Sequence, residues 1–384
     1  MVQLESFEVQ RNMNKEYTTL NMRFEHHLLE GSHYEIGQKQ AGIIKKNKQA
    51  VKIYTSGKFN SDKSKFSNFK EVYDLYDSLC LGLSEEAQGF ADELEVKIEK
   101  LFFYDFPYSI QGNCSQFVAL PSITEKSQVL VGRSYEWNFD NEDLQLRTTK
   151  VEGKYRHIGF SGMTYGRYEG LNDQGLCVTV SSGGAWGAPQ KNKTLNWALV
   201  VRVLLDNCRD VKEATKTLKE IPVEGTNNFI LSDKDGDIAY LEYLDGVFDE
   251  KHIDDKTDNE YLIATNHYNL PNKTQYNKYN NPWLLPNSKQ RYEIIEAALK
   301  KDIPKINQAT MLDLLSKEMP EGICCHWQTD YFGTLWQIVF NVSEGIAKIC
   351  FGPSTHNEWY DFAVDDKVTK NEYEVLFLDK RIKS

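Results

Sequence analysis

The chain has 384 residues, of which 40% are hydrophobic and 12% aromatic, so it is long enough to bury a large core. The 56 acidic residues outnumber the 45 Lys and Arg residues, and the formal net charge of -11 argues against nucleic acid as a partner. The start lacks the apolar run of a signal peptide, and no apolar stretch approaches about 18 residues, so we expect no membrane partner and a cytoplasmic location.

The first hundred residues are predicted to be mostly helical. Apolar residues recur at helical spacing over residues 33–46 and 84–104, and Ser84 with two following glutamates is typical of a helix start.

From Cys114 onward the pattern changes to short β-type runs bounded by turns. Strands are predicted at residues 117–120, 129–131, 176–180, 228–231, 238–243, 262–264 and 336–340, and helices at 195–206, 211–220 and 288–300. Strands interrupted by helices indicate an α+β layered sandwich.

Seven cysteines, an odd number scattered along the chain, argue against a disulfide framework. The run Cys324-Cys325-His326 suggests metal ligands at first sight, but adjacent cysteines rarely bind one ion and no second cluster completes a site. The chain also lacks a phosphate-binding Gly-rich loop, an HExxH motif and a GxSxG motif. We therefore expect no metal and no organic cofactor.

Two runs stand out where the helical pattern gives way to the strand pattern. The first is Gly112-Asn113-Cys114-Ser115-Gln116-Phe117, and the second is Val131-Gly132-Arg133-Ser134-Tyr135-Glu136-Trp137. In both order and spacing they resemble the penicillin acyltransferase and choloylglycine hydrolase families of N-terminal-nucleophile (Ntn) hydrolases. In those families a Gly-Cys-Thr/Ser step opens the mature catalytic chain.

Further segments resemble the same families in the same order along the chain. They are Glu30 to Gly37 (a Gly-x-x-Tyr-x-x-Gly segment), Glu86 to Glu95 (a Glu-x-x-Gly-x-Ala helix), Tyr168 to Leu176, Ala264 to Tyr268 and Asn287 to Tyr292. The resemblance implies a four-layer αββα Ntn sandwich over residues 114–384. A helical propeptide, residues 1–113, would stay attached noncovalently after a cut between Asn113 and Cys114.

The resemblance also implies roles for individual residues. Cys114 would be the nucleophile, and its freed α-amino group, with an unperturbed pKa of about 7.7–8.0, would be the general base. Arg133 would favour the thiolate and pair with Glu136, which would hold the amine. Asn266 would donate to the oxyanion, as the family's side-chain amide does.

Three further residues complete the implied site. Arg291 matches the family's buried arginine, and a second oxyanion donor is expected near Ser182. Tyr135, with Trp186 or Trp336, would line an acyl pocket. The expected substrate is a small-molecule linear amide, cleaved or transferred through a thioester, and the fold is compatible with a homo-oligomer.

Two residues depart from the family pattern, and two other hypotheses remain. Asn113 stands where a small residue is usual before the cut, and Glu136 stands where Asp is usual. A papain-type hydrolase would use Cys114 with His267 or His326 and would need no cut. A non-catalytic binding protein on the same fold would remain uncut, with Cys114 a buried structural thiol.

Overall fold

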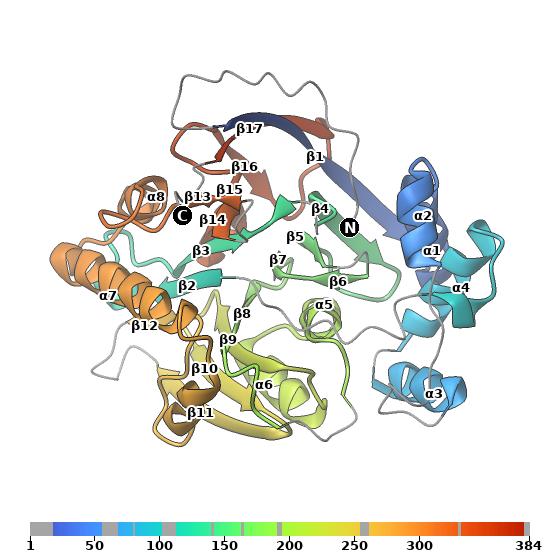
Figure 1. The fold of residues 1–384 in the computed structure, drawn as a ribbon, viewed down its shortest axis with the longest axis horizontal. Helices are drawn as coiled ribbons and strands as arrows, with labels where there is room; N and C mark the ends of the chain where they lie inside the picture. Colours follow the sequence, from blue (N-terminus) through green and yellow to red (C-terminus); the bar gives the residue numbers. More distant parts are fainter. Residues whose placement is uncertain are drawn as a thin grey trace.

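The computed structural model describes residues 18–55, 68–79, 81–101, 113–139, 142–162, 165–189, 194–253, 261–328 and 332–379. Two β-sheets pack face to face in it, and helices cover their outer faces, so the chain has the expected α+β, four-layer αββα architecture (Figure 1).

The first sheet includes the first and the last strand of the described residues. Its strand order is β11 (Val247–Ile253), β10 (Ile238–Leu244), β9 (Thr226–Asp233), β8 (Leu176–Ser182), β7 (Glu169–Asn172), β5 (His157–Gly162), β4 (Gln145–Val151), β1 (Thr18–Gly31) and β17 (Glu372–Asp379). The short strand β6 (Gly166–Arg167) pairs with β5 outside this path.

The second sheet carries the cysteine that the sequence singles out. Its order is β12 (Tyr261–Ala264), β2 (Asn113–Ala119), β3 (Leu130–Trp137), β14 (Phe332–Asn341), β15 (Ile346–Phe351) and β16 (Trp359–Ala363), with β13 (His326–Trp327) paired to β14. Strands β2 and β3 are antiparallel, and their register places Cys114 opposite Tyr135. Residues of β2 contact β8 and β9, so the sheets face each other at this point.

Helices form the two outer layers and a separate group at one end (Figure 1). Helices α5 (Trp197–Asn207) and α6 (Val211–Glu220) cover the first sheet, and α7 (Leu284–Asp302) and α8 (Gln308–Ser316) cover the second. The end group is α1 (His33–Ile44), α2 (Lys48–Tyr54), α3 (Phe69–Leu79) and α4 (Leu83–Glu93). Short 3-10 helices lie at Ile98–Lys100, Pro121–Ile123, Thr274–Tyr279 and Val342–Glu344. None of the helices in the described ranges combines the length and hydropathy needed to span a bilayer.

The local sequence explains the elements that were predicted. Strand β8 is buried along its whole length, because one face meets the second sheet and the other meets α5, so its residues are apolar or small. Helix α6 begins where the Asp210 side chain accepts a hydrogen bond from the Glu213 amide, and its apolar residues face the sheet.

The N-terminal region differs from its prediction in two ways. Strand β1 was not predicted, yet it lies between β4 and β17 within the first sheet. The helix predicted over residues 84–104 is shorter, because α4 begins at Leu83 after Gly82 in the left-handed region and ends at Glu93. Residues 102–104 of that prediction, and Gly112 of the cysteine motif, lie outside the described residues.

Candidate active site

Cys114 is the second residue of β2 and is completely buried. Side chains alternate along a strand, and Gln116, two residues further on, donates to Ser181 Oγ on β8 at 3.1 Å. The Cys114 side chain therefore points into the space between the two sheets.

The thiol lies beside a buried ion pair. Arg133 Nη2 is 3.4 Å from Cys114 Sγ, and Arg133 Nε donates to Glu169 Oε2 on β7 at 3.0 Å. Burial raises the pKa of the Cys114 thiol, and the Arg133 charge opposes that rise. The protonated thiol is thus the favoured form in this chain, with a cation in place to stabilise a thiolate.

The ion pair expected between Arg133 and Glu136 does not form. Three residues apart on one strand, the two side chains point to opposite faces, and Arg133 finds its partner on the other sheet. That partner, Glu169, also accepts from Trp336 Nε1 at 3.2 Å, and burial raises its pKa against the pull of Arg133.

Asn266 and Arg291 hold the Cys114 peptide group from both sides. The Cys114 amide donates to Asn266 Oδ1 at 2.7 Å, and Arg291 Nη1 donates to the Cys114 carbonyl at 2.6 Å. Arg291 Nη2 also donates to Asn266 Oδ1 at 2.8 Å, so the three residues form one closed network. All three are buried.

The Asn266 backbone and side chain are fixed by their surroundings. Its amide donates to Ser288 Oγ at 2.7 Å, and its carbonyl accepts from Asn280 Nδ2 at 2.8 Å. Its Nδ2 donates to the Ser182 carbonyl at 3.2 Å. The Ser182 hydroxyl itself accepts from Trp186 Nε1 at 2.7 Å, so this residue shapes the site through its carbonyl and its loop.

Glu136 lies on the opposite face of the sheet, toward the helices. Its Oε1 accepts from Ser134 Oγ and, at 3.3 Å, from Thr334 Oγ1, while its Oε2 has no hydrogen-bond partner among the described residues. Burial raises the pKa of Glu136 to about 7. Asn113, its cross-strand neighbour, is also buried with an unpartnered Oδ1 among the described residues.

Tyr135 belongs to an aromatic wall next to the thiol. Its ring stacks on Trp336 with centroids 4.3 Å apart, and its hydroxyl donates to Glu142 Oε1 at 2.6 Å. Trp336 stacks in turn on Phe160 at 4.3 Å. The wall connects the two sheets behind Cys114.

Reasoning from sequence missed three residues that build this site: Glu169, Ser288 and Asn280. Glu169 lay inside the matching segment Tyr168 to Leu176, but no strand was predicted at its position, so nothing indicated that it is buried and paired. Ser288 lies in α7, inside the matching segment Asn287 to Tyr292, and Asn280 lies shortly before α7. Nothing local in the sequence marks either residue as a partner of Asn266.

The two histidines of the papain-type hypothesis have partners away from the thiol. His267 Nδ1 lies 2.8 Å from Ser288 Oγ, and burial lowers its pKa to about 4. His326 Nε2 lies 3.2 Å from Thr355 Oγ1. Among the residues that the structure describes, no histidine bonds to Cys114, and no group of three or more His, Cys, Asp and Glu is arranged to hold a metal ion.

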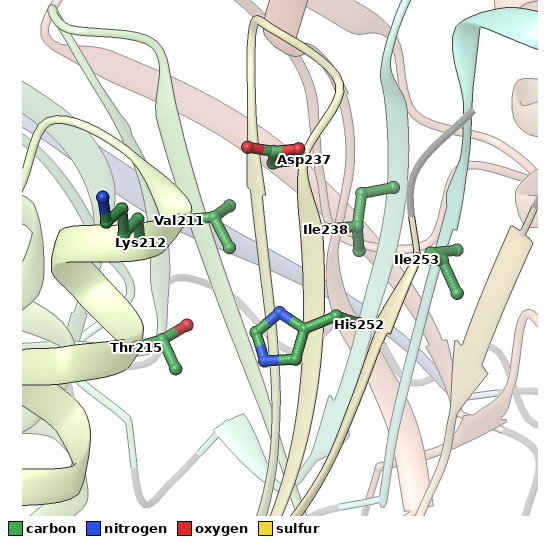
Figure 2. A pocket seen from close by; sticks show the side chains of 7 residues that line it. All are labelled: Val211, Lys212, Thr215, Asp237, Ile238, His252 and Ile253. Atoms are coloured by element: carbon green, nitrogen blue, oxygen red, sulfur yellow. The ribbon is translucent and has the colours of Figure 1, made fainter. Parts of the chain in front are cut away.

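A surface cavity of about 350 Å³ lies elsewhere, between the start of α6 and the β10–β11 hairpin (Figure 2). It is lined by Val211, Lys212, Thr215, Asp237, Ile238, His252 and Ile253. None of the predicted site residues lines it, so the cavity and the Cys114 network are separate features.

Comparison with known proteins supplies the family. The family model described as acyl-coenzyme A:6-aminopenicillanic acid acyl-transferase matches residues 123–355, which begin downstream of Cys114 and include Arg133, Glu136, Asn266 and Arg291. No curated protein shows significant sequence similarity to the chain.

Three solved structures are similar to the chain. Penicillin V acylase from Agrobacterium tumefaciens is 20% identical, with a TM-score of 0.44 over 65% of this chain and 86% of that one. The N-acylethanolamine-hydrolyzing acid amidase ortholog of Caenorhabditis elegans is 14% identical, with a TM-score of 0.43 over 60% and 93%. A mutant conjugated bile acid hydrolase from Clostridium perfringens is 13% identical, with a TM-score of 0.44 over 70% and 98%.

The family match spans more than half of the chain. It begins at Ile123, in the 3-10 helix that follows β2, and ends at Thr355, beyond β15. The chain therefore belongs to the acyl-coenzyme A:6-aminopenicillanic acid acyl-transferase family.

Proposed function

We propose that the protein is an N-terminal-cysteine amide hydrolase or acyltransferase that activates itself by cutting the bond between Asn113 and Cys114. One observation carries the proposal. The Cys114 thiol lies 3.4 Å from the Arg133 guanidinium while the amide nitrogen of the same residue lies 2.7 Å from Asn266 Oδ1. These are the two groups that the chemistry needs, since the thiol is the nucleophile and the nitrogen becomes the base.

In the cutting step, the Cys114 sulfur attacks the carbonyl carbon of Asn113. The bond from that carbon to the Cys114 nitrogen breaks, the nitrogen takes up the thiol proton to become a free amine, and a thioester forms. Water then hydrolyses the thioester, which leaves a carboxylate on Asn113 and a thiol on Cys114. Arg291 and Asn266 support this step by holding the Cys114 peptide group in place.

The two unpartnered oxygens support a cut at this bond. Glu136 Oε2 and Asn113 Oδ1 belong to the cross-strand pair beside it, and each buried acceptor without a donor costs about 1–3 kcal/mol. Cutting creates an α-ammonium group at Cys114 and frees the Asn113 end. A donor for Glu136 therefore arises only after the cut.

The mature site would then run the amide reaction. The α-amine of Cys114 takes the thiol proton, and the thiolate, stabilised by Arg133, attacks the substrate carbonyl. Asn266 Nδ2 would donate to the resulting oxyanion. The amine leaves with the proton, and water or an acceptor amine resolves the thioester.

The substrate that fits this site is a linear amide with an apolar acyl group. The aromatic wall of Tyr135 and Trp336 next to the thiol supports the apolar part. In the mature protein, residues 1–113 would be a small subunit and residues 114–384 the catalytic subunit.

An intact mass spectrum of the purified protein tests the proposal. We expect two fragments, with Cys114 as the first residue of the second, and we expect Cys114→Ala to give a single uncut chain. Cys208→Ala, which changes another buried cysteine at the end of α5, is the matched control and should cut normally.

A wild-type chain that stays uncut on long incubation would contradict the proposal. If amide-hydrolysing activity were then present and lost on replacing His267 or His326, the papain-type mechanism would hold. If the uncut chain had no activity and no alkylatable Cys114, the non-catalytic binding protein would hold.

A further inference from the structure

The N-terminal helices insert one negative charge into the core. Glu86 of α4 is completely buried, and its Oε2 accepts from Arg202 Nη2 at 3.2 Å. Its Oε1 lies 3.4 Å from Arg202 Nη1. Arg202 belongs to α5, which covers the first sheet, so the pair joins the two sides of the proposed cut.

Two glycines make this placement of Glu86 possible. Helices α1 and α4 cross so closely that a Cβ on Gly37 would lie 1.9 Å from the Glu86 carbonyl oxygen. A Cβ on Gly89 would lie 2.1 Å from the Tyr34 carbonyl oxygen. Both glycines belong to the N-terminal segments that the sequence analysis singled out, and the close crossing also brings His33 Nδ1 to 3.2 Å from Glu86 Oε2.

On the core side of this contact, the Asp143 charge favours the cationic form of Arg147, and Asp206 pairs with Arg202. Arg147, Arg167 and Arg202 are all fully buried there. Asp206 accepts from Arg202 Nε at 2.7 Å and lies 3.0 Å from His157 Nε2. Arg167 donates only to uncharged acceptors, Gly166 O and Thr149 Oγ1, and forms no ion pair among the described residues.

The pKa shifts of Arg167 and Glu86 agree with an excess of positive charge around Arg202. Burial, together with the nearby Arg202 and Arg147, lowers the pKa of Arg167. The pKa of Glu86 is lowered despite its burial, because Arg202 and His33 favour the carboxylate. Removing the N-terminal helices would leave Arg202 with Asp206 as its remaining acidic partner.

We propose that the cationic site formed by Arg202 and Arg167 is the docking site for the protein's own N-terminal segment, with the Glu86 carboxylate as its anchor. The proposal rests on the proposed cut, since only after it are the two parts separate molecules. Strand β1 adds main-chain hydrogen bonds to the first sheet, but these carry no charge. Glu86 therefore determines how firmly α1 and α4 are held, and β1 is held independently.

The test compares Glu86→Gln with Glu85→Gln, an exposed neighbour on the same helix. Glutamine keeps the shape of Glu86, so the apolar contact between Phe90 and Tyr165, with ring centroids 5.3 Å apart, stays in place. We expect hydrogen exchange of the α1 and α4 amides to be at least roughly tenfold faster in Glu86→Gln, as local opening becomes easier. Exchange in β1 and in the whole Glu85→Gln variant should match wild type.

In the cut protein, the same change should release the N-terminal fragment from the core at a lower urea concentration, as followed by size-exclusion chromatography. Equal exchange in α1 and α4 of both variants would overturn the proposal, whether or not the chain is cut. The intact mass reports the cut separately, so failure of the docking proposal and failure of self-cleavage are distinguishable. If Glu86→Gln does not fold, Glu86→Asp withdraws the carboxylate by one methylene, and wild-type exchange in that variant would overturn the proposal.

Discussion

Strands β2 and β3 present two faces that treat their polar groups differently. On the face between the sheets, Arg133 pairs with Glu169, and Glu169 accepts from Trp336 as well. On the face toward the helices, Glu136 Oε2 and Asn113 Oδ1 have no partners among the described residues. On the first face the Arg133–Glu169 pair is thus satisfied, although Gln116 Oε1 nearby has no partner among the described residues, and on the second face a carboxylate oxygen and an amide oxygen are buried without donors.

This difference indicates which buried residues need an explanation other than stability. A buried group that is fully paired is explained by stability, whereas a buried group without a partner costs free energy and calls for another explanation. The Arg133–Glu169 pair fixes the position of the thiol. Glu136 is the residue whose environment changes if the chain is cut.

The largest expected effect comes from breaking the Arg133–Glu169 ion pair. In the uncut Cys114→Ala background, Arg133→Met leaves Glu169 buried without its cation and should lower the free energy of unfolding by about 3–5 kcal/mol. Urea denaturation measures this change. Arg23→Met, which removes an exposed partner of Glu372, should change little.

The double variant Arg133→Met with Glu169→Gln sharpens this test. Because it also removes the stranded carboxylate, it should lose less stability than Arg133→Met alone. Equal losses would mean that the two side chains are not coupled.

On the face toward the helices, Glu136 should make the free energy of unfolding depend on pH. The pKa of Glu136 is about 7 in the folded chain against 4.5 ordinarily, so the folded state binds the proton more tightly. Stability from this group is complete below about pH 4.5 and is lost as pH rises through about 7, a loss of about 3 kcal/mol.

Glu136→Gln in the uncut background removes that dependence. It should be about 3 kcal/mol more stable than its parent at pH 8 and about equal at pH 4, as measured by urea denaturation across this range. Parallel pH profiles for the two proteins would show that ionising Glu136 costs the folded, uncut chain no free energy.

The smallest effect is expected from Trp336→Phe, on the face between the two sheets. The change removes the donor to Glu169 Oε1 and part of a stacked ring, so we expect a loss of about 2 kcal/mol in unfolding free energy with the Arg133–Glu169 pair intact. A loss as large as that of Arg133→Met would mean that the aromatic wall, rather than the ion pair, holds the face together.

Much of the fold could be predicted from local pattern. The helix predicted at residues 211–220 is α6, and the strands predicted around residues 176–180 and 238–243 lie within β8 and β10. Strand β1 was not predicted although Leu20, Met22 and Phe24 alternate with polar residues, which is the pattern of a half-buried strand. Its place between β4 and β17 depends on partners more than a hundred residues away.

The sequence by itself identified Cys114, Arg133, Asn266 and Arg291 as candidates, because they stand in family order, and in the structure they contact one another. Only the tertiary structure decided how they are paired. Strand alternation sends Arg133 and Glu136 to opposite faces, and sheet packing supplies Glu169 as the counter-ion. Pairing of buried charges is a property of elements distant in sequence, so no local pattern contains it.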